Sequence, residues 1–156
     1  PYRGGKTSLY DGGTCIPFLL RWPAVVSPGV SDALICQMDL LASLAALTGQ
    51  TYSDKTDSQN TLPVFLGKSD QGRKELVTEG YALHQGDWVM IPPYPAYYDD
   101  PDGVGFSGLG NCYQLYNIKE DIGQEHNLAE KEPRRLRQMI MTFEKLKRET
   151  GKITNY

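Results

Sequence analysis

A lysine that follows a pair of glycines near the start of the chain is the residue best suited to contact an anion. Lys6 comes directly after Gly4-Gly5, and a second pair follows at Gly12-Gly13. Glycines let the backbone approach a bound group closely, and a flexible ammonium can follow negative charge as it builds on an oxygen atom. The segment therefore suits anion binding, although an ordinary solvated loop lysine would look the same in sequence.

A second set of candidates lies in or beside a long loop. Residues 92–112 are rich in proline, glycine and tyrosine. Loops of this length inside a compact domain are uncommon and usually functional or mobile. Aromatic faces and phenol hydroxyls suit a sugar or an aryl group. The candidates for substrate binding are His84, Tyr94, Tyr97 and Tyr98. A tyrosine-rich loop that packs on its own sheet would have the same composition, and the sequence leaves both interpretations open.

Composition excludes several classes of protein. The chain has 16 Lys+Arg against 19 Asp+Glu, a net charge of −3, which argues against a protein that binds nucleic acid through its backbone. No stretch approaches the roughly 18 consecutive apolar residues that cross a bilayer. Neither histidine lies near a carboxylate cluster, so the sequence predicts no metal site within the chain.

The elements expected in the first part of the chain are one strand and one helix. The apolar run at 16–22 lies between prolines and predicts a strand buried on both faces. Residues 39–48 carry leucines at helical spacing, and we expect this leucine face to pack on a core. Asp39 is the expected N-cap of the helix, and Gly49 the left-handed residue that ends it.

The second part predicts a small sheet with one helix. Short strands are expected at 75–79, 81–84, 88–91 and 113–117, with a tight hairpin at Gln85-Gly86-Asp87. Pro133 opens an amphipathic helix that Gly151 should end and whose apolar stripe should dock on this sheet. The stripe consists of Leu136, Met139, Ile140, Phe143 and Leu146. The expected fold is α/β: the tail of a larger α/β domain over 1–66, then a four-stranded antiparallel sheet covered by a C-terminal helix over 67–156.

Several short motifs follow one another in a distinctive order. The first reads GGKTSLYDGGT from Gly4 to Thr14 and continues through Pro17-Phe18 and Arg21-Trp22-Pro23. The later ones are Ser31-Asp32-Ala33-Leu34, Asp39-Leu40-Leu41, Gly86-Asp87-Trp88 and the stretch from Gln114 to Ala129. In this order they resemble the motifs of type-I sulfatases, which belong to the alkaline phosphatase superfamily. Residues 50–75 and 92–112 match poorly, and Cys15 stands where the family usually has arginine.

The resemblance implies that the chain is the C-terminal portion of a sulfuric ester hydrolase and is inactive by itself. Lys6 then corresponds to the catalytic lysine that contacts the sulfate oxygens. The family's nucleophile is a formylglycine made within a C/S-x-P-S-R motif, and its calcium ion is held by aspartates. The chain has no such motif. We therefore expect both the formylglycine and the Ca2+ ligands upstream of Pro1.

The resemblance also implies the partners and the compartment. The expected substrate is a sulfated small molecule or a sulfated carbohydrate, and the expected protein partner is the N-terminal remainder of the same protein. A periplasmic, extracellular or lysosomal location would be typical of the family.

Two alternative functions remain open from the sequence. A hydrolase of the same superfamily could act on phosphate esters or phosphonates. A stand-alone carbohydrate-binding or scaffold module could use the tyrosine loop instead. The strand expected at 16–22 counts against the module, because a strand removed from a larger sheet leaves an unpaired edge. For the same reason we expect that the isolated fragment self-associates.

Overall fold

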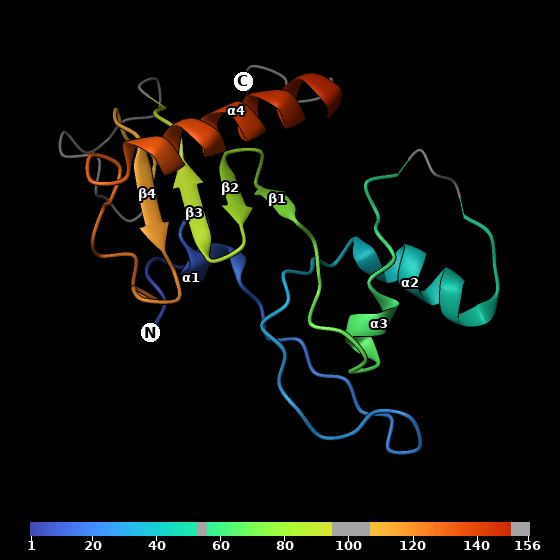
Figure 1. Cartoon of the computed structure of the whole chain (residues 1–156). Helices are drawn as coiled ribbons and strands as arrows, with labels where there is room; N and C mark the ends of the chain where they lie inside the picture. Colours follow the sequence, from blue (N-terminus) through green and yellow to red (C-terminus); the bar gives the residue numbers. More distant parts are fainter. Residues whose placement is uncertain (53–55, 95–106, 151–156) are drawn as a thin grey trace. The chain divides into compact units, whose positions relative to one another are not determined.

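The computed structural model describes residues 1–52, 56–94 and 107–150 (Figure 1). Contacts divide the chain into two units, one formed by Pro1–Ile16 with Val77–Tyr156 and the other by Pro17–Leu76. The N-terminal residues of the chain therefore pack in the same unit as the sheet, which is formed by the C-terminal half. The predicted domains, 1–66 and 67–156, stay a prediction about the longer protein. Within the described ranges, no helix is long and apolar enough to cross a membrane.

The larger unit is built on a four-stranded sheet with the order β1-β2-β3-β4. The strands are β1 (Glu75–Thr78), β2 (Ala82–Gln85), β3 (Trp88–Ile91) and β4 (Gln114–Asn117). β2 pairs antiparallel with β3, and β3 with β4. The β2–β3 hairpin closes where Gln85 pairs with Trp88, and Gly86 has a φ of 58°, which suits a tight turn. All four predicted strands are confirmed to within a residue at each end.

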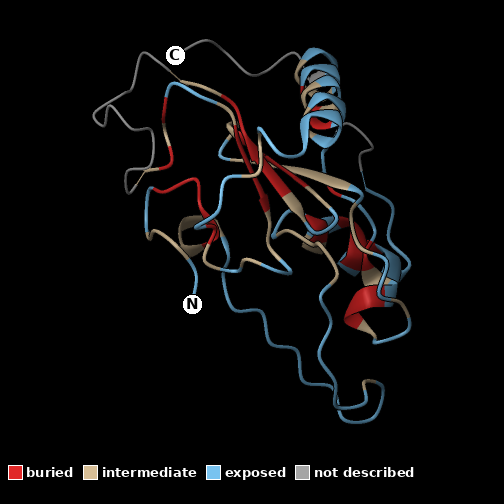
Figure 2. Cartoon of the chain, turned by 60° about the vertical axis from the view of Figure 1, so that its left-hand side comes forward, coloured by how far each residue is buried: buried red, intermediate tan, exposed pale blue. Residues whose placement is uncertain are grey.

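One face of the sheet packs on the C-terminal helix α4 (Pro133–Thr150). The buried side chains of this layer are Leu83, Met90, Leu115, Met139 and Phe143. Leu136, Ile140 and Leu146 pack against the same cluster, so the predicted stripe does dock on the sheet. Figure 2 shows the burial along the strands and the exposed outer face of α4. Gly151, the expected end of this helix, lies outside the described residues.

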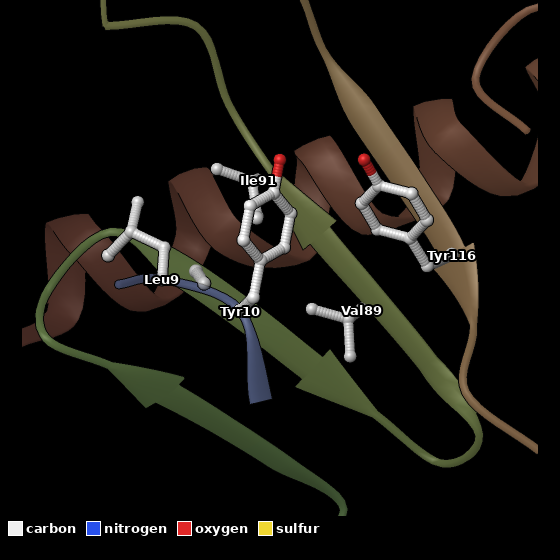
Figure 3. Close-up of a cluster of buried hydrophobic side chains, with 6 residues drawn as sticks. Leu9, Tyr10, Val89, Ile91 and Tyr116 are labelled. Carbon is white, nitrogen blue, oxygen red and sulfur yellow. The ribbon is translucent and has the colours of Figure 1, made fainter. Parts of the chain in front are cut away.

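The other face of the sheet packs on the N-terminal segment of the chain. Its cluster contains Leu9, Tyr10, Ala82, Val89, Ile91 and Tyr116 (Figure 3). Period-2 alternation explains the division, because consecutive residues of β3 point to opposite faces. A short helix, α1 (Asp11–Thr14), continues directly from this cluster. The sheet is thus covered on both faces, and the segment around Lys6 is attached to it through Leu9 and Tyr10.

The smaller unit contains two helices, α2 (Asp39–Thr48) and α3 (Leu62–Phe65). The extent of α2 is as predicted, and Gly49 ends it with a φ of 67°. The predicted N-cap is wrong by one residue, because Met38 holds that position and Asp39 is the first helical residue. Asp39 is instead completely buried and accepts hydrogen bonds from both Nε and a terminal nitrogen of Arg73.

Two predictions about burial in this unit are wrong for the chain as described. The segment 16–22 forms no strand and is exposed throughout, and the side chain of Leu19 is 92% exposed. No described strand pairs with this segment, and a strand exists only where its backbone groups are paired with those of a neighbour. Three of the four leucines of α2 are also exposed, at 53% for Leu41 and 51% for Leu44, because Ala42 and Ala45 lie on the buried face of the helix.

Candidate functional site

Lys6 lies at the tip of a tight turn whose backbone is strained. The turn is closed by the Ser8 amide, which donates to the Gly5 carbonyl over 2.9 Å and leaves Lys6 and Thr7 as its central residues. Thr7 has a φ of 76°. This left-handed conformation costs a β-branched residue about 1–3 kcal/mol. The surrounding structure must hold the turn in place, and the turn presents the Lys6 side chain to solvent.

The second glycine pair holds that turn by allowing close backbone contact. The amide of Gly12 donates to the Arg3 carbonyl over 2.8 Å. A Cβ atom added to Gly13 would lie 2.6 Å from the Gly5 carbonyl oxygen and would also clash with the Ser8 carbonyl. Both contacts are shorter than real side chains tolerate. The glycines before Lys6 and the glycines of α1 are therefore packed directly on one another.

Tyr10 connects this turn to the sheet through a buried hydrogen-bond network. The hydroxyls of Tyr10 and Tyr116 both donate to Oε1 of Gln114, over 2.8 and 2.9 Å. Figure 3 shows both hydroxyls pointing in the same direction from neighbouring rings. Gln114 in turn donates from Nε2 to the Gly108 carbonyl over 2.8 Å. Burial raises the pKa of Tyr116, so its hydroxyl remains a proton donor at physiological pH.

A second anchor is Gln124, which joins the charged residues on either side of the turn. Its Oε1 accepts from the Asp11 amide over 2.8 Å, and its carbonyl accepts from Arg3 over 2.8 Å. The Arg3 guanidinium also lies over the Tyr10 ring, 4.2 Å from its centroid. Arg3 thus holds the N-terminal segment through Gln124 and Tyr10.

His84 is buried beside Asp11 on the face of the sheet that carries Tyr10. Its Nε2 lies 4.0 Å from Oδ1 of Asp11, and neither atom has a hydrogen-bond partner among the described residues. Burial raises the pKa of Asp11 and lowers the pKa of His84, and the charge of each residue opposes the shift of the other. Sequence reasoning placed His84 with the substrate-binding loop and did not pair it with Asp11. Its role in substrate binding stays a prediction.

The exposed side of the turn borders a hollow of about 480 Å³. Lys6, Thr7, Ser8, Leu9 and Gly13 line it from the N-terminal segment. Glu79, Tyr81 and Leu109 line it from the β1–β2 turn and the segment before β4. A cation, a carboxylate and an aromatic ring thus share one concave surface. The sequence did not single out Glu79 or Tyr81, and the only local signal for them is the adjacent Gly80.

Tyr94 packs against Tyr81, one of the residues that line this hollow. Its ring packs edge-on against the Tyr81 ring, with centroids 4.7 Å apart, and its hydroxyl donates to the Tyr81 carbonyl over 3.1 Å. Burial raises the pKa of Tyr94, which keeps the hydroxyl protonated. Tyr97 and Tyr98, the other predicted loop residues, lie outside the described residues.

The donor set for the calcium ion that the resemblance implies is not found in the described parts of the chain. Ca2+ takes six to eight oxygen ligands. No group of three or more His, Cys, Asp or Glu side chains is placed to hold a metal within residues 1–52, 56–94 and 107–150. The described residues therefore do not fit the ion.

Comparison with known proteins identifies the family. No family model matches the chain. It is 37% identical over 157 residues to an N-acetylgalactosamine-6-O-sulfatase of Bacteroides thetaiotaomicron, an alignment that covers 94% of the chain and 30% of that protein. It is 34% identical over 103 residues to arylsulfatase A of Homo sapiens, which covers 65% of the chain and 17% of that protein.

The fold agrees with the same family. A solved structure of a protein from glycosaminoglycan metabolism in Bacteroides thetaiotaomicron matches with a TM-score of 0.82 at 36% identity. The match covers 94% of this chain and 32% of that one, so the chain spans about a third of the length of its relatives. The agreement of sequence and fold over nearly all of these residues confirms the resemblance that the GGKTSLYDGGT segment suggested. The chain belongs to the sulfatase family.

Proposed function

We propose that the chain is the C-terminal portion of a protein that hydrolyses sulfate esters, and that Lys6 contacts the sulfate oxygens of the substrate. The observation that carries the proposal is the turn that presents Lys6. Thr7 is held at a φ of 76°, and glycines pack backbone against backbone beneath it. Strain of this kind persists only where the surrounding structure over-determines it, and it is concentrated at functional sites.

Lys6 suits the reaction because hydrolysis of a sulfate ester builds negative charge on oxygen atoms. By analogy with phosphoryl transfer, positioning and charge stabilisation supply most of the catalysis. An ammonium at a fixed place binds the anionic group and becomes more favourable as charge moves toward the leaving oxygen. The formylglycine nucleophile and the calcium ion of the family would be supplied by residues outside this chain.

The substrate class that we propose is a sulfated carbohydrate or another small sulfate ester. The relative from Bacteroides thetaiotaomicron is named N-acetylgalactosamine-6-O-sulfatase. The hollow beside Lys6 is lined by polar, apolar and aromatic side chains. Of the loop candidates, Tyr94 would contribute to substrate binding indirectly, by holding the Tyr81 ring in place. His84 would contribute through its contact with Asp11, in the helix that follows the Lys6 turn. Tyr97 and Tyr98 remain proposed contacts of the substrate.

The test is the replacement of Lys6 in the full-length enzyme. Lys6→Ala should lower kcat/KM for 4-nitrophenyl sulfate by about a hundredfold or more, the loss typical of one group that stabilises transition-state charge. Lys119→Ala is the matched control, because Lys119 is an exposed lysine of the same unit that does not line the hollow. A near-normal rate in Lys6→Ala would remove Lys6 from the mechanism.

The same enzyme distinguishes sulfate from phosphate esters. We expect 4-nitrophenyl sulfate to be the better substrate than 4-nitrophenyl phosphate. The reverse preference would assign the protein to phosphate-ester hydrolysis within the superfamily. The isolated chain should hydrolyse neither ester, because it contains no C/S-x-P-S-R motif for the nucleophile.

A further inference from the structure

We propose that Glu79 and Tyr81 form a subsite that binds the sugar ring of the substrate while Lys6 holds its sulfate. This inference rests on the proposed function, and it adds the residues that would distinguish a sulfated sugar from a simple aryl sulfate. All three side chains line the hollow of about 480 Å³, a volume suited to a small ligand.

Glu79 occupies a backbone position that does not favour glutamate. The β1–β2 turn is closed by the Tyr81 amide, which donates to the Thr78 carbonyl over 2.9 Å. Its central residues, Glu79 and Gly80, have φ values of 54° and 75°. Two positive φ angles define a type I′ turn, in which Asn-Gly is the preferred pair. A glutamate is kept here against that preference, which indicates that its carboxylate has a role other than shaping the turn.

The charged side chains that line the hollow are available to contact a ligand. Lys6 and Glu79 line the same surface and are both exposed, yet no ion pair joins them among the residues that the structure describes. A carboxylate accepts hydrogen bonds only, so Glu79 would bind a hydroxyl or an acetamido N–H and would repel a second sulfate. An ammonium donates only, so Lys6 suits the sulfate. The two groups therefore complement opposite ends of one sulfated sugar.

Tyr81 supplies the apolar part of the subsite. Tyr81 is only partly buried and lines the hollow, and Tyr94 fixes its ring by edge-on packing, with the ring centroids 4.7 Å apart. The Tyr94 hydroxyl is bonded to the Tyr81 carbonyl, so backbone and ring are held together. A ring fixed before binding loses little entropy when a ligand arrives. The C–H face of a sugar can pack on such a ring, with its hydroxyl groups directed at Glu79.

The experiment compares two substrates in the full-length enzyme. The sugar substrate is 6-O-sulfated N-acetylgalactosamine, and the reference is 4-nitrophenyl sulfate, which has no hydroxyl or N–H to offer Glu79. Glu79→Gln should lower kcat/KM for the sugar about tenfold or more, the typical value of one hydrogen bond to a charged group. The rate on the reference should stay within about twofold, since it depends on the sulfate contact alone. Glu130→Gln, at an exposed glutamate that does not line the hollow, should change neither.

A second variant separates recognition from folding. Glu79→Asn places the favoured residue in the type I′ turn, so its melting temperature should equal or exceed that of the unchanged protein. Its shorter side chain should nevertheless lose the sugar preference. Loss of stability together with loss of activity on both substrates would mean that Glu79 only supports the turn, and would overturn the subsite.

The remaining outcomes distinguish this inference from the proposed function. Equal losses on both substrates, or no loss on the sugar, would overturn the subsite while leaving sulfate hydrolysis intact. If the unchanged enzyme cleaved neither ester, the proposed function would fail, and calorimetric titration with the sulfated sugar would then decide the subsite. Binding weakened about tenfold by Glu79→Gln would support it, and unchanged binding would overturn it.

Discussion

Replacing Gly13 by alanine should displace Lys6 without touching it. A Cβ atom at Gly13 would lie 2.6 Å from the Gly5 carbonyl oxygen, one residue before Lys6, and would also collide with the Ser8 carbonyl. An ordinary contact of 3.4 Å requires the Gly5 oxygen to move by about 0.8 Å. Neither neighbour can give way as a flexible side chain would, because both are backbone atoms of the turn. A misplacement of about 1 Å at a reacting group can cost about a hundredfold in rate.

The assay measures kcat/KM of the full-length Gly13→Ala enzyme on 4-nitrophenyl sulfate, together with its thermal unfolding. We expect a loss of about a hundredfold in kcat/KM. Overpacking should also cost about 1–3 kcal/mol of stability. Gly29→Ala is the matched control, since a Cβ there meets nothing within 4 Å, and it should change kcat/KM by less than about twofold. A Gly13→Ala enzyme with the rate of the control would refute the close packing that positions the turn.

Three further predictions concern ionisable side chains. Asp39→Asn should lower the free energy of unfolding, measured by urea denaturation, by about 3 kcal/mol, because it leaves the buried Arg73 guanidinium without its counter-ion. A change of less than about 0.5 kcal/mol would contradict a desolvated ion pair. Burial lowers the pKa of His84 below 6.5, so the unfolded chain takes up the proton first and stability should fall as the pH drops below that value, by at most about 1.4 kcal/mol per pH unit. His84→Gln should flatten this dependence in an Asp11→Asn background, in which the opposite effect of the raised Asp11 pKa is absent; an unaltered slope would exclude His84 as the titrating group. Cys15 is an exposed residue, but desolvation of its thiol and the neighbouring Asp11 carboxylate raise the pKa of the thiol to about 11. Iodoacetamide should therefore alkylate it at pH 8 about a hundredfold more slowly than in the unfolded protein, and faster in Asp11→Asn; equal rates would show an unperturbed thiol.

Elements specified by neighbouring residues could be predicted from the sequence. The β2–β3 hairpin follows from a glycine in a two-residue turn between alternating strands. Helix α4 follows from a proline at its start and an apolar stripe at helical spacing. In each case a short window contains both the pattern and the residue that closes the turn or begins the helix, so the prediction needs no knowledge of distant contacts.

Burial in the smaller unit could not be predicted, because a pattern indicates that a side chain should be covered but not what covers it. The leucines of α2 have the spacing of a buried face, yet Leu41 and Leu44 are half exposed in this chain. The apolar run at 16–22 likewise has the pattern of a buried strand, and it is exposed in this chain. A strand needs paired neighbours on its edges, and no described strand pairs with this segment, although the Phe18 ring packs on the Phe65 ring with centroids 5.4 Å apart.

The candidate site could be predicted only where its residues are close in sequence. Lys6 and its glycines lie within one short segment, and the motif pointed to them. The residues that fix the segment lie far along the chain: Gln114 bonds to Tyr10 across 104 positions and Gln124 to Asp11 across 113. No periodicity relates such pairs, so the network under the turn, and the pairing of Asp11 with His84, became visible only in the folded chain.

The attachment of the Lys6 turn to one face of the sheet has a consequence for truncated forms of the protein. Removing α4 would take Met139 and Phe143 off the opposite face and leave Leu83, Met90 and Leu115 open to water. Strands so uncovered would no longer hold Tyr116 and the Gln114 amide in register for Tyr10. A deletion confined to the last helix would thus disturb the turn that carries Lys6, more than a hundred residues earlier in the chain, and under the proposed function it would lower activity without changing any residue of the N-terminal part of the protein.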